Sequence, residues 1–139
     1  MPHAGLMNER LMGAVEGPLQ RARLHIRGGR RRIRQGKVSA GIATIADALS
    51  AALEWFAATE GNGPAKDDRK LYQELVRSCR ISGAFDYDAF DRLTEQALNN
   101  ELESFDPADV MAGFEALMAE LGVMPFDETS LPPEDPKTF

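Results

Sequence analysis

Apolar side chains recur along this chain at helical spacing, in five segments that glycine and proline separate. Steps of three and four residues place such side chains on one face of a helix. No stretch shows the strict alternation that a half-buried strand requires. Helices are expected at about residues 18–35, 38–60, 67–80, 86–102 and 106–122. The pattern predicts an all-α protein, an up-and-down bundle of four to five helices with an irregular acidic C-terminal tail.

The first two segments should form a helical hairpin. Pro18 suits a first helical position and Gly36 suits a helix end. The first apolar stripe is Leu19, Ala22, Ile26, Gly29 and Ile33, and the second is Ile42, Ile45, Ala46, Leu49, Ala52, Leu53 and Phe56. Gly28 and Gly29 each weaken a helix by roughly 1 kcal/mol relative to alanine. A close helix crossing would explain the pair, and so would a kink.

The three later segments carry clear end signals. Asp86 or Asp88 should begin one helix, while Asp106 and Pro107 should cap and begin the last, which Gly122 ends. The expected inner faces are Leu71, Leu75, Val76 and Cys79, then Phe90, Leu93, Ala97 and Leu98, then Val110, Phe114, Leu117, Met118 and Leu121.

One helical domain is expected, with a terminal segment on either side of it. Residues 18–122 should form the bundle, and residues 1–17 should be weakly ordered or form a short helix. Residues 123–139 hold four prolines and an excess of acidic side chains, which is typical of an extended or disordered tail. No apolar run approaches a membrane span and no secretory pattern opens the chain, so the sequence predicts a cytoplasmic protein without a membrane partner.

Charge is distributed very unevenly along the chain. Eight of the sixteen basic residues lie between Arg21 and Lys37, where there is no acidic residue. Residues 1–40 hold nine basic and two acidic side chains, whereas residues 41–139 hold seven basic and twenty acidic ones. Such polarity indicates an anionic or self-complementary partner for the basic end.

The basic residues of the first helix are the candidate site. At helical spacing, four arginines form one ridge beside the apolar stripe, and a fifth lies next to them. The candidate anion- or partner-binding residues are Arg21, Arg23, His25, Arg27, Arg30, Arg31 and Arg34. Guanidinium groups suit phosphate and carboxylate. The simpler interpretation is a solvated face whose arginines pair with acidic residues of the later helices.

Other candidate chemistry is weaker. Arg21 and His25 lie one turn apart, where they could hold a phosphate and move a proton, although an exposed histidine in a basic helix is the simpler interpretation. Two distant histidines and one cysteine do not make a zinc site, and Asp86, Asp88 and Asp91 suit helix capping better than a calcium loop. Cys79 should be a buried, inert thiol. Without a glycine-rich phosphate loop, the sequence indicates no cofactor and no metal.

The run Gly36-Lys37-Val38-Ser39-Ala40-Gly41-Ile42-Ala43-Thr44-Ile45-Ala46-Asp47-Ala48-Leu49-Ser50-Ala51-Ala52-Leu53-Glu54-Trp55 resembles the second helix of the HEPN superfamily. The resemblance covers about residues 18–60. It implies a helical bundle that is often dimeric, found in ribonucleases, toxins and non-catalytic partners of nucleotidyltransferases. The family's catalytic arginine and histidine lie on a later helix with four to six residues between them. This chain has no histidine after His25, and only three residues separate Arg21 from His25. No catalytic residue carries over, so the resemblance implies a non-catalytic member.

Three functions are compatible with these patterns. The leading prediction is a non-enzymatic interaction module, a small bacterial-type helical protein that binds a protein or other anionic partner, or a second copy, through the basic helix. The alternatives are a nucleic-acid-binding protein that uses the ridge from Arg23 to Arg34, and a degenerate HEPN-type ribonuclease built on Arg21 and His25. The acidic tail should lie against the basic ridge or reach a second subunit, anchored by Phe126, Leu131 and Phe139.

Overall fold

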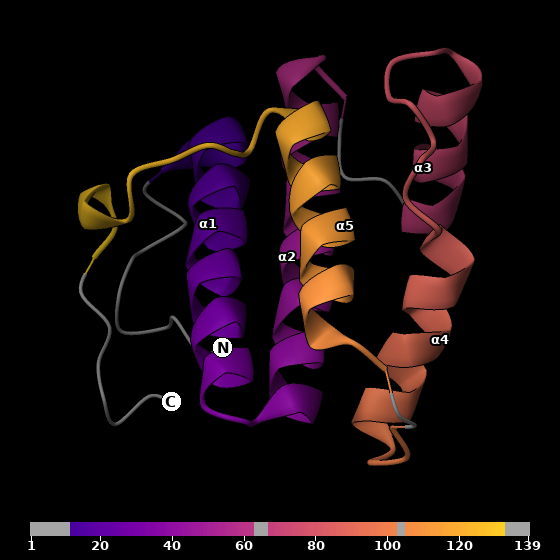
Figure 1. Ribbon diagram of the computed structural model, residues 1–139. Coiled ribbons are helices and arrows are strands. Elements are labelled where there is room, and N and C mark those ends of the chain that lie inside the picture. Colours follow the sequence, from indigo (N-terminus) through magenta and orange to yellow (C-terminus); the bar gives the residue numbers. More distant parts are fainter. Residues whose placement is uncertain (1–11, 63–66, 103–104, 133–139) are drawn as a thin grey trace.

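The computed structural model describes residues 12–62, 67–102 and 105–132 (Figure 1). These residues form helices and loops but no strand, which confirms the predicted all-α bundle. The elements of this described part are α1 (Gly13–Arg34), α2 (Val38–Thr59), α3 (Asp68–Arg77), α4 (Tyr87–Leu98), α5 (Pro107–Leu121) and the 3-10 turn η2 (Glu128–Ser130).

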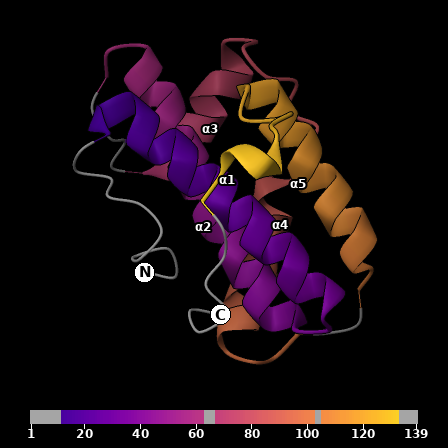
Figure 2. The same cartoon turned by 90° about the vertical axis from the view of Figure 1, so that its left-hand side faces the viewer.

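Helices α1 and α2 form a tight antiparallel hairpin (Figures 1 and 2). Gly36 turns the chain between them with a φ of +81°. Gly29 and Gly41 face each other where the helices cross, because a Cβ built on Gly29 would lie 2.4 Å from Cγ2 of Ile45 and one on Gly41 would lie 3.2 Å from the oxygen of Gly29. A close helix crossing therefore explains the glycine at position 29.

The expected start of α1 is wrong. The helix begins at Gly13, so Pro18 lies inside it and not at its first position. A proline there has no N–H to donate to the carbonyl of Ala14. Pro18 is buried, and packing of this kind can outweigh a local signal for a helix start.

Aspartate caps define the starts of the three later helices. Asp67, Asp86 and Asp106 each accept a hydrogen bond from a backbone N–H in the first turn of α3, α4 and α5 respectively. The predicted cap at Asp106, the first position of Pro107 and the end at Gly122, which has a φ of +90°, are all confirmed.

Two helix ends come earlier than expected. Helix α3 stops at Arg77, and Cys79 follows it with a φ of +61° and an exposed side chain, so the expectation of a buried thiol is wrong. Helix α4 stops at Leu98, whose side chain is 70% exposed and does not belong to the inner face. Asn100 follows with a φ of +57°. Residues in the left-handed region end a helix whatever the apolar pattern beyond them.

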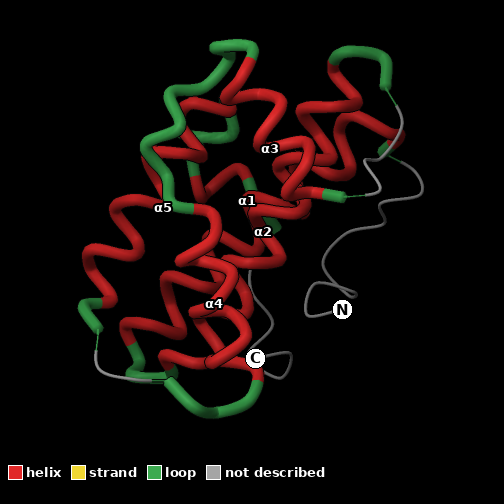
Figure 3. The backbone as a smooth tube through the Cα atoms, turned by 90° about the vertical axis from the view of Figure 1, so that its right-hand side faces the viewer, coloured by secondary structure: helices red, strands yellow, loops and turns green. Residues whose placement is uncertain are grey.

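Helix α2 is the centre of the molecule and contacts each of the four other α-helices. In Figure 1, α3 and α4 lie one above the other beside it, and Figure 3 views the molecule from their side. The largest fully buried side chains are Phe114, Ile26, Ile42, Ile45, Leu53, Leu117, Met118 and Val123. By length and composition α2 could also span a membrane, with a mean hydropathy of 1.2, but it is the buried core helix here.

Candidate functional site

All seven candidate residues lie on α1, but they do not form one open ridge. Only Arg34 is exposed, whereas the other five arginines are partly buried and His25 is buried. The side chain of Arg30, at the middle of the expected ridge, is 27% exposed. Part of the burial of these basic side chains arises because the chain after α5 returns across α1.

The C-terminal segment, defined here as residues 123–132, lies along α1 (Figures 1 and 2). Its first residue, Val123, is fully buried, and its carbonyl accepts a 3.1 Å hydrogen bond from Nε of Arg23. The ring of Phe126 lies against two guanidinium groups, 5.5 Å from that of Arg23 and 6.0 Å from that of Arg30. Leu131, near its end, is only 5% exposed.

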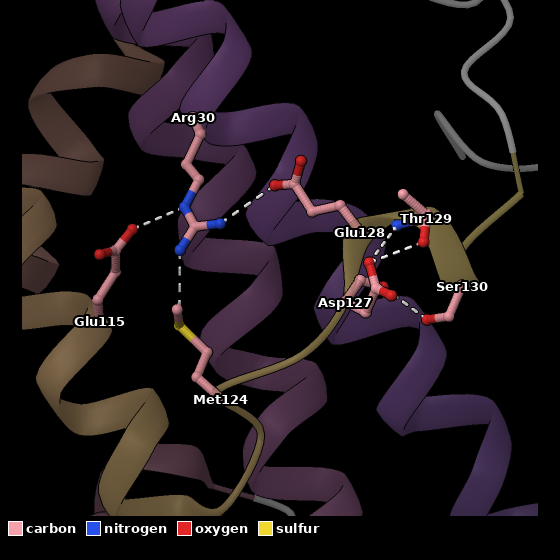
Figure 4. Close-up of polar contacts among 7 residues, drawn as sticks. All are labelled: Arg30, Glu115, Met124, Asp127, Glu128, Thr129 and Ser130. Atoms are coloured by element: carbon pink, nitrogen blue, oxygen red, sulfur yellow. Dashed lines mark hydrogen bonds and ion pairs between the residues drawn. The ribbon is translucent and has the colours of Figure 1, made fainter.

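Arg30 connects this segment to α5 (Figure 4). Its Nε donates to Glu115 of α5 at 2.7 Å, and one terminal nitrogen donates to Glu128 of η2 at 3.1 Å. The other terminal nitrogen lies 3.9 Å from the sulfur of Met124. One guanidinium therefore holds two carboxylates from elements that are far apart in the sequence.

Asp127 organises the turn that carries Glu128. Its carboxylate accepts hydrogen bonds from the backbone N–H and the hydroxyl of Thr129, at 2.9 and 2.8 Å (Figure 4). These hydrogen bonds favour the ionised form and lower the pKa of Asp127. The turn thereby places an acidic side chain one residue after its cap and directs it to Arg30.

Two expectations about charge can now be assessed. The described part of the tail lies against the basic helix, as expected. Phe126 is its anchor there, and Leu131, the second expected anchor, is buried. Residues 123–132 are irregular apart from η2, as predicted, but the burial of Val123 and Leu131 shows that this part of the tail packs on the protein. Phe139, the third expected anchor, lies outside the described residues.

Other arginines of α1 contact α2. Arg21 forms an ion pair with Glu54, and Arg32 donates a 2.7 Å hydrogen bond to the hydroxyl of Thr44. That hydroxyl in turn donates to the carbonyl of Ala40 at 2.7 Å. The basic residues of α1 therefore serve the hairpin as well as the C-terminal segment, which the sequence pattern alone did not reveal.

The expectation of an exposed His25 is wrong. The imidazole is 3% exposed, and its Nδ1 lies 2.9 Å from the carbonyl oxygen of Arg21, to which a protonated Nδ1 donates. Burial lowers its pKa below the ordinary histidine value, although this hydrogen bond and the charge of Asp47 act in the opposite direction. The ring is therefore neutral at pH 7 and packed inside the protein, away from any phosphate in solution.

The acidic cluster before and within α4 has structural contacts. Asp86 caps the helix, as predicted, while Asp88 and Asp91 both pair with Arg69 of α3. Within the described ranges, no three histidine, cysteine or acidic side chains are grouped so as to hold a metal ion.

The sequence did not identify the acidic residues that pair with Arg30. Glu115 and Glu128 are separated from Arg30 by 85 and 98 residues, so no local pattern connects them. The overall charge asymmetry was the one available signal, and it did not identify individual partners. Comparisons of the chain with protein-family models, curated proteins and solved structures found no match. The HEPN resemblance therefore stays a prediction.

Proposed function

We propose that this chain is a non-enzymatic interaction module whose α1 binds a short acidic segment that carries an aromatic residue. The supporting observation is the contact that α1 makes with its own C-terminal segment, where Phe126 lies against Arg23 and Arg30 while Glu128 pairs with Arg30. The same chemistry suits a segment of another protein that presents an aromatic ring two residues before a carboxylate.

The contacts are individually weak, which suits an exchangeable ligand. A cation–π contact at a partly exposed site contributes about 0.5–1 kcal/mol, and an exposed ion pair contributes about 0–1 kcal/mol. Tethering raises the effective concentration of the chain's own segment to roughly the millimolar range. An external segment must therefore exceed this internal competitor in affinity or effective concentration before it can occupy α1.

The interaction-module proposal needs no reaction at Arg21 and His25. Arg21 is paired with Glu54, and His25 is buried among the helices. A ribonuclease would need these groups to reach a phosphate and exchange a proton with it. The HEPN relationship, dimerisation and cytoplasmic location stay predictions that the interaction-module proposal does not require.

A labelled peptide with the sequence of residues 123–132 tests the proposal by fluorescence anisotropy. In the full chain, Phe126→Ala with Glu128→Gln and Leu131→Ala should release α1 and allow the peptide to bind at least about tenfold more tightly than it binds the wild type. Adding Arg23→Gln and Arg30→Gln should abolish that gain. A scrambled peptide of the same composition is the control, and circular dichroism checks that each variant is folded.

Two results would contradict the interaction-module proposal. One is a released variant that fails to bind the peptide at low salt. The other is binding of single-stranded RNA or DNA that depends on Arg23 and Arg30 and weakens steeply with salt, while the peptide does not bind. The second result would support the nucleic-acid alternative.

A further inference from the structure

A groove lies between α4 and the first half of α5. Figure 3 shows the backbone of these two helices. Its volume is about 350 Å³. The large apolar side chains that line it come from both helices and from the loops before them, and they are Phe85, Phe90, Leu93, Phe105 and Val110. A concave apolar surface of this kind accepts the anchor side chains of a docking helix.

The outward face of α5 continues this surface with small residues. Seven positions of α5 are exposed, and five of them are alanine or glycine: Ala108, Ala112, Gly113, Ala116 and Ala119. A Cβ built on Gly113, which lines the groove, would meet nothing within 4 Å. The exposed face of a helix normally carries long polar side chains. Here the small residues leave room for a second backbone to approach closely.

Charge indicates which partner fits the groove. The two charged residues among its described lining are Asp86 and Asp109, both acidic. With their caps Asp86 and Asp106, α4 and α5 carry eight acidic side chains and one basic one, Arg92. Although Asp88 and Asp91 are paired with Arg69, and Glu115 with Arg30, the field along both helices remains negative. Complementary charge favours a basic partner and repels an acidic one.

We propose that the α4–α5 groove is a docking site for a basic amphipathic helix of another protein. One or two large apolar side chains of that helix enter the groove beside Phe90 and Val110, its backbone lies along the small residues of α5, and its flanking Lys or Arg side chains face Asp86 and Asp109. The site is distinct from the basic face of α1, so it stands or falls independently of the proposed function.

The probe is a labelled 16-residue helical peptide with leucine on one face and lysine on its flanks, added to the full chain at low salt. We expect it to bind, and we expect binding to weaken as salt rises. Gly113→Gln fills open space at the groove and should weaken binding at least tenfold. Ala40→Gln places the same side chain at an exposed position of α2 outside the groove and should leave binding unchanged.

Further variants test whether the acidic charge at the groove contributes to binding and whether α1 takes part. Asp109→Lys should weaken binding several-fold, and Arg30→Gln on α1 should have no effect. The proposal is overturned if a peptide with glutamate in place of lysine binds equally well, or if Gly113→Gln has no effect. It is also overturned if the wild type is a dimer that Gly113→Gln separates and the peptide does not bind, because the groove would then hold a second copy of this chain.

Discussion

Gly29 and Gly41 determine how closely α1 and α2 approach. Gly29→Ala would place its Cβ 2.4 Å from Cγ2 of Ile45, a fully buried β-branched side chain that has little room to move. Overpacking of this kind costs typically about 1–3 kcal/mol, of which the better helix propensity of alanine offsets roughly 1. We expect a net loss of up to about 2 kcal/mol in the free energy of unfolding, measured with denaturant.

Gly113→Ala is the matched control for this prediction. Gly113 also lies inside a helix, but its Cβ would meet nothing within 4 Å. The same substitution should therefore stabilise the protein by up to about 1 kcal/mol. Equal effects at Gly29 and Gly113 would mean that propensity, and not the helix crossing, explains the glycine in α1.

His25 should make the stability of the protein depend on pH. Burial lowers its pKa in the folded protein, so between the folded and unfolded pKa values the unfolded chain binds more protons. Stability should therefore fall as the pH drops below about 6.5, the ordinary histidine pKa. Arg21 and Arg32 act in the same direction as burial, while Asp47 opposes them. For one proton the slope cannot exceed about 1.4 kcal/mol per pH unit.

His25→Asn isolates this contribution, since its amide can still donate to the carbonyl of Arg21. Comparing the unfolding free energies of both proteins between pH 7.5 and pH 5 cancels the carboxylates that they share. The wild type should lose more stability than the variant over this range. Parallel curves would show that His25 does not control the pH dependence.

Single residues with a local role were the easiest to predict. The caps at Asp86 and Asp106 and the end at Gly122 follow from short-range hydrogen bonding, and the structure has all three. The burial of His25 and the exposure of Cys79 were not predictable in this way. The burial of His25 depends on tertiary packing around α1. The exposure of Cys79 depends on its own positive φ, just after the early end of α3.

At the level of the elements, the apolar stripes located the helices well, but they did not show how deeply each side chain of a stripe is buried. Phe114 of α5 is fully buried, and its ring lies 6.2 Å from that of Phe90 in α4, measured between centroids. Phe56 of α2 belongs to a stripe of the same kind, yet it is partly exposed beneath the guanidinium of Arg80, 4.9 Å away. Replacing each phenylalanine with alanine should therefore lower the free energy of unfolding by different amounts.

Phe114→Ala should lower the free energy of unfolding by about 3–5 kcal/mol, because it removes a fully buried ring and leaves a cavity. Phe56→Ala should cost less than that, since its site is open to water on one side. Denaturant unfolding of both variants measures the difference. If Phe56→Ala costs as much as Phe114→Ala, the partial exposure of Phe56 does not limit its contribution.

Helix boundaries are predicted less well than the helices themselves. Glycine and proline predicted every connection between helices, but Pro18 gave a start five residues too late because its packing inside α1 outweighs its usual position. Tertiary contacts of this kind are absent from a local pattern. The same limit applies to the candidate site, where the pattern predicted a basic helix and an acidic tail against it but could not show which carboxylates pair with which arginines.

For the whole molecule, the distribution of charge links the fold to the proposed function. The basic N-terminal part and the acidic remainder meet where α1 contacts α5 and the C-terminal segment, with Arg30 between Glu115 and Glu128. The sequence predicted that the tail would lie against α1 or reach a second subunit. The burial of Leu131 argues that the segment also stabilises the fold.

Deleting residues 124–139 should therefore lower the melting temperature. The deletion keeps Val123 in the core but removes the buried Leu131 and the pair between Glu128 and Arg30. Ordering the segment costs chain entropy, so its net contribution is only part of what its contacts supply. We expect a loss of about 1–2 kcal/mol, or roughly 3–8 °C for a chain of this length.

Two point variants in the full chain identify the cause of that loss. If apolar burial holds the segment, Leu131→Ala should reproduce most of the fall in melting temperature. Glu128→Gln should lower it by much less, because a partly exposed ion pair contributes about 0–1 kcal/mol. An unchanged melting temperature after the deletion would mean that the segment only covers α1. A segment that contributes little stability but blocks α1 can be displaced easily, whereas one held by Leu131 requires a partner that leaves this anchor in place or replaces it.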